Sequence, residues 1–343
     1  MKKKKVIHVL FSGNVSGAEN IAMKIITVTN KQSIGYCLSP SGNINNVLKE
    51  KNITHLEWKN FSIIQFIKFL VEIKPDVVHA HDFKASVLSA IFVWRSRIIS
   101  HLHQNPPWLE KLNFKSILYY LLSFRFNTIV LVSDWKIGKK NILNNLNHKI
   151  NIIPNYIDFN EIKIKANTIE KVPEYDLIFL GRLSPEKDPL RFLEVVEKIS
   201  LIKNDITIAI VGDGSLMNSC REFVNNKLSH LKIDFYGYLS NPYPILKNSK
   251  AIVLTSKWEG FGLVAVEAAI LNVRVVASAC GGLENIVNEN IGILCKTNSE
   301  FIDAILNVLN HDKNSKLKID FLSTYGDEEK WRKSLLTLWG IQN

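Results

Sequence analysis

The sequence predicts an α/β protein made of two Rossmann-like domains, each with a parallel sheet covered on both faces by helices. Three observations predict this fold class. Short, continuously apolar, β-branched runs alternate with longer helix-like stretches along the chain. The alternation forms two series, one in each half of the sequence. The 343 residues, 46% hydrophobic and 22% charged, are enough for two domains with separate cores.

The first half contains five predicted strands. They are the apolar runs at residues 6–11, 76–79, 98–101, 128–132 and 150–153, with helix-like stretches at 17–30 and 61–73. The N-terminus resembles a signal peptide, because lysines at residues 2–5 precede the apolar run at 6–11. The apolar part is too short for one, contains His8 and lacks a small-residue cleavage site, so it is predicted to be the first strand.

The second half repeats the pattern. Its predicted strands are residues 177–180, 206–211, 233–236, 251–254 and 275–277, with helices at 189–199 and 262–271. Residues 158–173 are polar, show little apolar periodicity and are predicted to be a linker. We therefore expect an N-terminal domain over residues 1–158 and a C-terminal domain over residues 159–327.

The last predicted helix, over residues 328–340, carries an apolar stripe. The stripe consists of Trp331, Leu335, Leu338 and Trp339, and it follows a break with capping chemistry at 324–327. A terminal helix with such a stripe docks on a neighbouring surface. We expect it to cross back to the N-terminal domain; packing against its own domain is the alternative.

Composition and charge narrow the class of protein. No apolar run approaches the roughly 18 residues that span a bilayer. The four cysteines show no ligand spacing, which favours a reduced cytosolic protein with neither a disulfide framework nor a zinc site. Residues 1–160 hold 21 Lys and Arg against 9 Asp and Glu, a net charge of +12, whereas the whole chain carries +11. This asymmetry indicates a polyanionic partner, nucleic acid or anionic lipid, or else a solvated basic face.

The densest functional signal lies at residues 256–268, after a predicted strand and at the start of a helix. Gly260 and Gly262 allow the backbone to approach a ligand closely, and the N-terminus of the following helix favours an anion. Glu259 lies in the loop and Glu267 inside the helix. Carboxylates accept hydrogen bonds from sugar hydroxyls, so the loop is predicted to bind a phosphorylated sugar.

Three other loops follow predicted strands. The loop at 181–188 contains Arg182 and Lys187, which could converge on a diphosphate or could be two solvated cations. Gly-Asp-Gly at 212–214 is interpreted as a plain turn. Gly281 and Gly282 stand where ligands bind in open α/β sheets, at the carboxyl end of a strand.

Together these motifs resemble the retaining nucleotide-sugar glycosyltransferases of family 4, of the bacterial surface-polysaccharide type, which have the GT-B architecture. The most specific part is Glu259 to Glu267, and segments 181–187, 236–238 and 281–282 support it. The resemblance implies two Rossmann-like domains that face each other across a cleft. The chain departs from the family pattern at four positions: Ser16, Tyr156, Asn272 and Arg274. These departures weaken any assignment of the sugar.

The resemblance also implies how the donor phosphates are held. Arg182 and Lys187 would bind the diphosphate and stabilise the leaving nucleoside diphosphate, a task that other enzymes give to a metal. No metal or other cofactor is therefore expected. The backbone of three residues would meet the phosphate and sugar: Phe261, Gly262 and Leu263.

Further roles follow from the same resemblance. Glu259 would bind hydroxyls of the transferred sugar, and Glu267 those of the ribose. Gly17 would let the first loop approach the diphosphate, and His103 would lie beside the anomeric carbon. The backbone near two further residues would meet the base: Tyr238 and Leu239.

The histidines of the first half raise a choice. We interpret His101 and His103 as pointing to opposite faces of a strand, so that only one, His103, faces the site. His79 and His81 are expected to be structural. Because these histidines stand on separate predicted strands, a metal site built from them is not expected.

The stretch 108–126 is rich in Leu, Tyr and Phe and contains Lys111, Lys115 and Arg125. An apolar helix with basic residues can lie in a membrane interface. A core helix with extended lysine side chains is the alternative. Interleaved lysines and aromatics also suit single-stranded nucleic acid, but no known nucleic-acid module is recognisable, so no nucleic-acid partner is expected.

The expected activity is retaining transfer of a hexose or N-acetylhexosamine from a nucleotide-diphosphate sugar, and the expected donor is a UDP-sugar. The expected acceptor is a lipid-linked saccharide for a lipopolysaccharide or capsule. The enzyme would be cytoplasmic and peripheral on the inner membrane face. There are three alternative functions. A GT-B epimerase would lack the Glu259–Glu267 pattern, and a sugar phosphorylase would need a lysine that binds pyridoxal phosphate. The third alternative is a non-catalytic protein that binds anionic surfaces.

Overall fold

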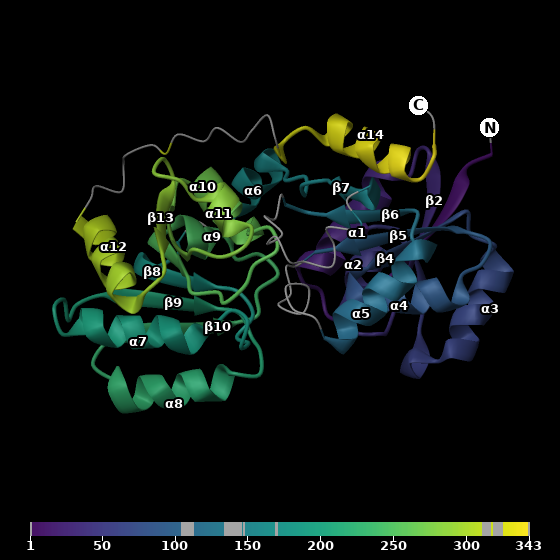
Figure 1. Ribbon diagram of the computed structural model, residues 1–343. Coiled ribbons are helices and arrows are strands. Elements are labelled where there is room, and N and C mark those ends of the chain that lie inside the picture. Colours follow the sequence, from purple (N-terminus) through teal and green to yellow (C-terminus); the bar gives the residue numbers. More distant parts are fainter. Residues whose placement is uncertain are drawn as a thin grey trace. The chain divides into compact units, whose positions relative to one another are not determined.

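The computed structural model describes residues 2–103, 113–133, 146, 148–168, 171–310, 317 and 325–341. The chain divides into two compact units (Figure 1). Unit 1 comprises Met1–Tyr156 and Asp327–Asn343, and unit 2 comprises Ile157–Gly326. The boundaries expected from the sequence lie one or two residues later. The predicted fold class is confirmed, because each unit is a parallel sheet with helices on both faces.

Within its described residues, unit 1 has a seven-stranded parallel sheet in the order β3-β2-β1-β4-β5-β6-β7. The strands are β1 (Lys4–Val9), β2 (Ser33–Ser39), β3 (Thr54–Glu57), β4 (Val77–His81), β5 (Arg97–Leu102), β6 (Thr128–Leu131) and β7 (Ile150–Ile152). The helices are α1 (Gly17–Thr29), α2 (Ile44–Glu50), α3 (Ile63–Ile73), α4 (Asp82–Phe92), α5 (Phe114–Leu122) and α14 (Glu328–Leu338). The strand order reverses at β1, as in dinucleotide-binding folds.

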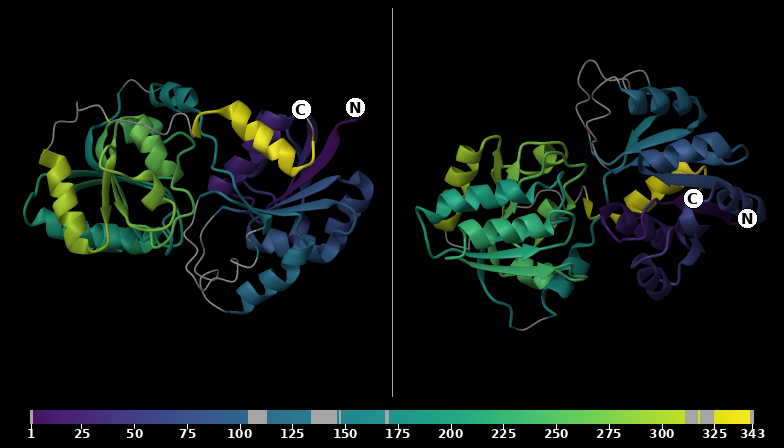
Figure 2. Two further views of the ribbon diagram at one scale, coloured as in Figure 1. Left: turned by 45° about the horizontal axis from the view of Figure 1, so that its top comes forward. Right: turned by 90° about the horizontal axis from the view of Figure 1, so that it is seen from below.

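The helices of unit 1 cover opposite faces of its sheet. The connections through α3, α4 and α5 run in the opposite direction to those through α1 and α2, so right-handed crossovers place the two groups on different faces. Figures 1 and 2 show α3, α4 and α5 as one layer. Helix α14 packs against α1 on the other face. Its apolar stripe is buried, as a docked terminal helix requires, and Trp339 is fully buried.

Unit 2 has, among its described residues, a six-stranded parallel sheet in the order β10-β9-β8-β11-β12-β13. The strands are β8 (Tyr175–Leu180), β9 (Thr207–Val211), β10 (Lys232–Gly237), β11 (Ser249–Leu254), β12 (Arg274–Ser278) and β13 (Gly292–Cys295). The helices are α6 (Phe159–Ala166), α7 (Pro189–Ser200), α8 (Met217–Lys227), α9 (Tyr243–Lys247), α10 (Leu263–Ile270), α11 (Leu283–Ile286) and α12 (Asn298–Asn310).

Two expectations about the course of the chain are wrong. The segment interpreted as a linker forms α6, whose N-cap Asp158 accepts a hydrogen bond from the backbone N–H of Glu161. Phe159 and Ile162 of this helix are buried, and it packs against α9. Strands β2, β3 and β13 were not predicted. Glycine interrupts β2 and begins β13, and the residues of exposed β3 are largely polar, so their local patterns are weak.

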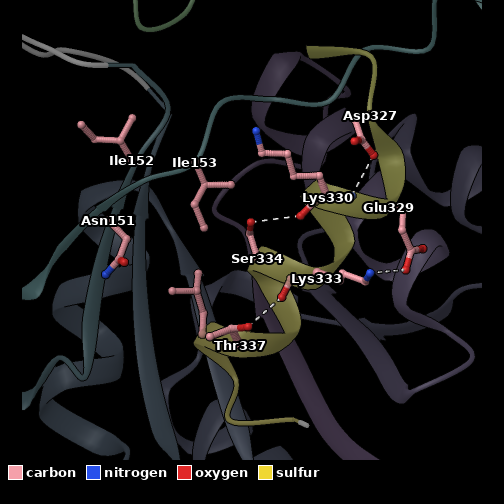
Figure 3. Close-up of a pocket in the computed structure, with 10 residues that line it drawn as sticks. Asn151, Ile152, Ile153, Asp327, Glu329, Lys330, Lys333, Ser334 and Thr337 are labelled. Atoms are coloured by element: carbon pink, nitrogen blue, oxygen red, sulfur yellow. Dashed lines mark hydrogen bonds and ion pairs between the residues drawn. The ribbon is translucent and has the colours of Figure 1, made fainter. Parts of the chain in front are cut away.

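A groove of about 650 Å³ lies between α14 and the edge strand β7 of unit 1 (Figure 3). Its lining residues are Asn151, Ile152, Ile153, Asp327, Glu329, Lys330, Lys333, Ser334, Thr337 and Leu338. No residue that the sequence predicts for the site lines it. The chemistry of the chain must therefore be sought at the carboxyl edges of the two sheets.

Candidate functional site

Loops from several strands of unit 2 meet at the carboxyl edge of its sheet. The N–H of Leu183, after β8, donates to the carbonyl of Asp213, after β9, at 2.9 Å. The N–H of Lys257, after β11, donates to the carbonyl of Glu186, after β8, at 2.8 Å. These hydrogen bonds make the loops one connected surface at the place where parallel sheets bind ligands.

Two glycines allow these loops to pass close to each other. A Cβ atom at Gly212 would lie 1.9 Å from the carbonyl oxygen of Gly181, and φ at Gly212 is +138°. A Cβ atom at Gly282 would lie 2.4 Å from the carbonyl oxygen of Gly260. The turn at 212–214 is thus more than a plain turn, because its first glycine makes room for the loop after β8.

Lys187 and Glu259 form an ion pair at this edge although 72 residues separate them. Their side chains are 27% and 17% exposed, so solvent screens the pair only partly. The hydroxyl of Ser256 also donates to the same Glu259 oxygen at 3.3 Å. An ammonium group held beside a carboxylate gives one point that attracts phosphate and one that accepts from hydroxyls.

Arg182 is placed differently from Lys187. Its guanidinium lies 3.9 Å from Glu186 on the same loop, and its side chain is about half exposed. Exposed pairs of this kind contribute little to stability. The guanidinium can therefore leave Glu186 for a phosphate at small cost.

Helix α10 begins at Gly262, whose φ of +90° is a left-handed conformation that glycine adopts without strain. A Cβ atom there would lie 2.9 Å from the Leu283 side chain. The first turn of α10, which includes Leu263, directs N–H groups and the positive end of the helix dipole towards the loop. Phe261 is buried in this loop. The geometry suits an anion at the start of α10.

Glu267 lies one turn into α10 and accepts a hydrogen bond from the Tyr243 hydroxyl at 3.3 Å. Burial and this carboxylate raise the pKa of Tyr243 above its usual range, so the phenol remains a donor. Tyr238 and Leu239 follow β10, where Tyr238 is exposed and Leu239 is half-buried. These residues are available for a flat ring or a ribose, as the resemblance implies.

In unit 1, the interpretation of the histidines is wrong. His101 and His103 point to the same face of β5, with ring centroids 4.1 Å apart. The side-chain period of a strand is two, so residues i and i+2 share a face. His79 and His81 share a face of β4 for the same reason, and β4 pairs with β5. The separate strands therefore bring the histidines together instead of keeping them apart.

A fifth histidine, His8 of β1, completes the cluster. All five side chains are buried, and burial lowers the pKa of each. The pKa of His8 falls to about 3 and that of His103 to about 4. At neutral pH the cluster is therefore uncharged.

Asp82 lies beside His103 and was not predicted. Its carboxylate accepts a hydrogen bond from the backbone N–H of His103 at 3.0 Å, and its φ is +67°. Burial raises its pKa to about 6. A carboxyl with a raised pKa in a left-handed conformation at a strand end is typical of a functional edge. Its position directly after β4 was the sequence signal that could have identified it.

Gly17 begins α1 at the carboxyl edge of the same sheet. The preceding Ser16 and the buried Glu19 form a capping box, with the hydroxyl of Ser16 donating to the carboxylate. The Glu19 carboxylate opposes the lowering of the His103 pKa, which places it near that imidazole. Gly17, His103 and Asp82 thus belong to one edge of unit 1.

A comparison with known families identifies unit 2. Residues 160–319 match the model for glycosyl transferases group 1, and this range includes Arg182, Lys187, Glu259 and Glu267. The matched range lies within unit 2 and covers just under half of the chain. The resemblance stated from the loop motifs is confirmed at the level of group 1 glycosyl transferases.

The relatives of this chain include proteins named as glycosyltransferases. An uncharacterized glycosyltransferase of Methanocaldococcus jannaschii is 27% identical over 262 residues, 68% of this chain and 64% of that protein. The UDP-Gal:alpha-D-GlcNAc-diphosphoundecaprenol alpha-1,3-galactosyltransferase of Escherichia coli is 27% identical over 277 residues, 72% of this chain and 69% of that protein. The chain thus matches about two thirds of the length of these relatives.

Solved structures confirm the GT-B fold over almost the whole chain. Anabaena HepE, in complex with UDP and glucose, has a TM-score of 0.81 at 17% identity and covers 98% of this chain and 99% of its own. The lipopolysaccharide outer core galactosyltransferase WaaB has a TM-score of 0.67 at 16% identity, with coverages of 97% and 98%. At these identities the likeness concerns the fold.

Proposed function

We propose that this glycosyltransferase moves a hexose or N-acetylhexosamine from a UDP-sugar to a lipid-linked saccharide, with retention of the anomeric configuration. The product would contribute to a surface polysaccharide such as a lipopolysaccharide or capsule. The observation that carries the proposal is the Lys187–Glu259 pair beside the N-terminus of α10. This edge offers a cation, helix N–H groups and a carboxylate in one place.

Each group has a task in the proposed reaction. Lys187 and Arg182 stabilise the charge that grows on the departing diphosphate, and the N-terminus of α10 adds to this field. When phosphate takes over the ammonium of Lys187, Glu259 becomes available to sugar hydroxyls. Glu267 is assigned to the ribose.

The remaining steps need few protein groups. The leaving diphosphate takes the proton of the acceptor hydroxyl, so the proposed reaction needs no protein base. Gly17 is assigned to the diphosphate and His103 to the transferred sugar, where a neutral imidazole can hydrogen-bond to a hydroxyl. Because cationic side chains neutralise the diphosphate, we propose that transfer requires no metal ion.

The names of two relatives support the class of donor and acceptor. The Escherichia coli relative uses UDP-Gal and a diphosphoundecaprenol-linked sugar. A Campylobacter jejuni relative, 26% identical over 169 residues, is an N-acetylgalactosaminyltransferase acting on a PP-undecaprenol-linked saccharide. Both acceptors are attached to lipid, so an enzyme that uses such an acceptor must work at a membrane surface.

The layer of α3, α4 and α5 supports peripheral attachment to the membrane. Large apolar side chains on these elements and the turns that follow them are exposed: Ile63, Ile64, Ile67, Val71, Ile91, Trp94, Phe114, Ile117, Leu121 and Phe124. Exposed apolar side chains that gather on one layer of helices are typical of an interaction site. We call this set the apolar layer. Among the described residues, none of the helices is long and apolar enough to span a membrane.

Charge favours an anionic bilayer as the partner of the apolar layer. Lys84, Arg95 and Lys115 are exposed on or next to its helices, and residues 1–160 carry the whole positive excess. Basic residues near an anionic surface contribute about 1 kcal/mol each. The alternative of a core helix fits α5 poorly, because Phe114 and Leu121 are exposed although Tyr119 is buried.

Product analysis with a panel of nucleotide sugars tests the proposed function. We expect hydrolysis or transfer, with thermal stabilisation, for one or more UDP-sugars in the presence of a lipid-linked saccharide. Conversion of the free UDP-sugar into an epimer, without release of UDP, would indicate an epimerase. If no nucleotide sugar in the panel is turned over and none stabilises the protein against heat, the proposed function is wrong.

A further inference from the structure

The five buried histidines of unit 1 form two hydrogen-bonded rows. In the first row, His103 Nε2 lies 2.7 Å from His81 Nδ1, and His81 Nε2 lies 3.1 Å from His8 Nδ1. In the second row, His79 Nε2 lies 3.1 Å from His101 Nδ1. The rows stack on each other, with the His79 and His81 ring centroids 4.7 Å apart at an interplanar angle of 10°.

Rings within a row meet edge to edge. The His81 and His103 centroids are 5.0 Å apart and their planes differ by 11°. With the nitrogens at 2.7 Å, this centroid distance is about the largest that two imidazoles can have. The rings therefore lie nearly in one plane with the nitrogens facing each other, which is good hydrogen-bond geometry.

The same geometry argues against a metal ion in the cluster. Two sets of nitrogens lie within 4.8 Å of one another, His8 with His79 and His81, and His81 with His101 and His103. An ion would need three lone pairs that converge on one point about 2 Å from each nitrogen. Here the nitrogens within a row point at each other, and rings of different rows meet through their faces. The cluster is a hydrogen-bond network.

A hydrogen bond from Trp339 of α14 determines which nitrogens donate and which accept in the second row. Its indole Nε1 donates to His79 Nδ1 at 3.3 Å, and an indole N–H can only donate. A neutral His79 that accepts at Nδ1 carries its proton on Nε2. It then donates to Nδ1 of His101, so His101 also carries its proton on Nε2.

Burial makes this argument hold at neutral pH. The pKa values of His79 and His101 lie well below the usual value, chiefly because burial disfavours the charged ring. Each imidazole therefore carries one proton, and fixing one nitrogen as an acceptor fixes the other as a donor. The Nε2 atom of His101 has no partner among the described residues, although the side chain is buried.

Within the described part of unit 1, the first row has no such fixed donor at either end. His81 is hydrogen-bonded to His103 and to His8, and each of these three rings can donate or accept. Both directions of the row are therefore compatible with neutral rings. His103 can present either an N–H or a lone pair at Nδ1, whereas His101 presents only an N–H.

Lys4 holds the C-terminal end of α14, which carries Trp339, against β1. The ammonium of Lys4 on β1 donates to the carbonyls of Trp339 at 3.1 Å and of Gly340 at 2.9 Å. A cation at the C-terminus of a helix also complements the helix dipole. The indole thereby has a fixed position over the histidines.

We propose that Trp339 is a positioning residue that fixes His79 and His101 in the Nε2–H tautomer, so that His101 is a permanent hydrogen-bond donor beside His103. The ligand for that donor would be an oxygen atom of a substrate hydroxyl at the end of β5. This last step rests on the proposed function, whereas the tautomers do not. A segment from the end of the chain thus completes the polar edge of unit 1.

Nitrogen NMR of the full chain with labelled histidine rings tests the tautomers directly. In the parent protein we expect His79 and His101 to show a protonated Nε2 and an unprotonated Nδ1 from about pH 5 to about pH 8. A protonated Nδ1 in either ring of the parent overturns the proposal. This measurement needs no variant and no activity.

Matched variants test the part played by the indole N–H. Trp339→Phe keeps an aromatic ring but removes the donor, so His79 and His101 should become mixtures of tautomers. Trp331→Phe is the control, because Trp331 is buried on the same helix and packs against Tyr156 with ring centroids 5.7 Å apart. Unchanged tautomers in Trp339→Phe, or the same change in both variants, would overturn the proposal.

Kinetics then test the link to the substrate. Trp339→Phe should lower kcat/KM about 10-fold relative to Trp331→Phe, the effect of losing one hydrogen bond. Equal kcat/KM values with altered tautomers would show that His101 does not contact substrate. If no UDP-sugar is used at all, the proposed function fails while the tautomer result still stands.

Discussion

The two sheets carry polar groups at their carboxyl edges in opposite ways. In unit 2 the groups are charged and partly exposed, as in the Lys187–Glu259 pair. In unit 1 they are buried and neutral, as in the histidine rows around His81 and His103. An exposed cation suits a phosphate, whose charge must be met, whereas a neutral imidazole suits a hydroxyl. The difference shows how one sheet architecture can hold two kinds of chemistry.

The surfaces of the two units away from the carboxyl edges also differ in their polarity and charge. Unit 1 contains the apolar layer and the positive excess of the chain, while unit 2 contains most of the ion pairs among the described residues. In the proposed function, membrane attachment and donor chemistry therefore belong to separate units. The predictions below test the contrast, from the largest expected effect to the smallest.

Acid should unfold unit 1 before unit 2. The unfolded histidines titrate near pH 6.5, but in the folded unit their pKa values are lower, about 4 for His103 and about 3 for His8. Below about pH 6.5 the five histidines therefore bind protons in the unfolded chain that they do not bind in folded unit 1. Asp82, whose pKa is raised to about 6, has the opposite effect but is a single group. The free energy of unfolding should fall by up to about 1.4 kcal/mol per pH unit for each buried histidine, or several kcal/mol together.

Urea unfolding at about pH 7.5 and about pH 5 measures this effect. Tryptophan fluorescence reports mainly on unit 1, because Trp258 is the one of the seven tryptophans that lies in the sequence range of unit 2. Hydrogen exchange resolves the two units separately. The described part of unit 2 contains one histidine, His230, and it is exposed, so unit 2 lacks the buried histidines that make unit 1 sensitive to acid. Equal loss of stability in both units would contradict the account of the buried rows.

Lys187→Ala and Glu259→Ala should each reduce sugar transfer by at least about 100-fold, the usual effect of losing a positioned electrostatic group. Lys257→Ala is the matched control. Its ammonium pairs with Asp188 at 3.2 Å in the neighbouring loop, so it should retain most of the activity. Near-parental transfer by the first two variants, with folding intact, would refute the assigned site.

Polar substitutions in the apolar layer should weaken binding to anionic vesicles. Phe114→Ser combined with Leu121→Ser removes two exposed side chains and should lower the bound fraction about 10-fold at low salt. Leu201→Ser is the control, because Leu201 of unit 2 is 79% exposed, the same fraction as Phe114. High salt should release the parent, and neutral vesicles should bind it far less.

Equal co-sedimentation of the double variant and the parent would exclude the apolar layer as the membrane contact. Substitution of Arg125 is a poor test. Its guanidinium donates to the carbonyls of Ala90 and Val93 and lies 4.3 Å from the Trp94 ring centroid, so it also supports the fold. Lys111 lies outside the described residues.

A chelator should have the smallest effect. The proposed site meets the diphosphate with Lys187, Arg182 and the N-terminus of α10, so transfer should continue in excess EDTA. Loss of activity that manganese or magnesium restores would show that a metal takes part in the reaction. The same outcome would weaken the contrast between the charged edge of unit 2 and the neutral edge of unit 1.

The sequence predicted the two-sheet fold because continuously apolar strands such as β8 and β11 are strong local signals. It missed α6, which is short and whose apolar residues alternate with lysine and other polar residues, and the exposed strand β3. The loop with Glu259 was recognisable from its glycines and the following helix. Its partner Lys187 was identified as a site residue, but the ion pair between them depends on the adjacency of β8 and β11, which no local pattern contains.

The histidine rows illustrate the other limit. The spacing of His101 and His103 already implied a shared face, and the period of a strand was misapplied to it. The contribution of Trp339 was beyond sequence reasoning, because 260 residues separate it from His79. A hydrogen bond over that separation becomes visible only when the last helix is placed against the sheet.

Direct binding of UDP tests the central claim, that the carboxyl edge of unit 2 binds a nucleoside diphosphate. Calorimetry should be performed without added metal on the parent, Lys187→Ala and Lys257→Ala. We predict saturable binding to the parent, at least about 10-fold weaker binding to Lys187→Ala, and near-parental binding to Lys257→Ala. No binding to the parent, or equal affinity in the parent and Lys187→Ala, would contradict the claim.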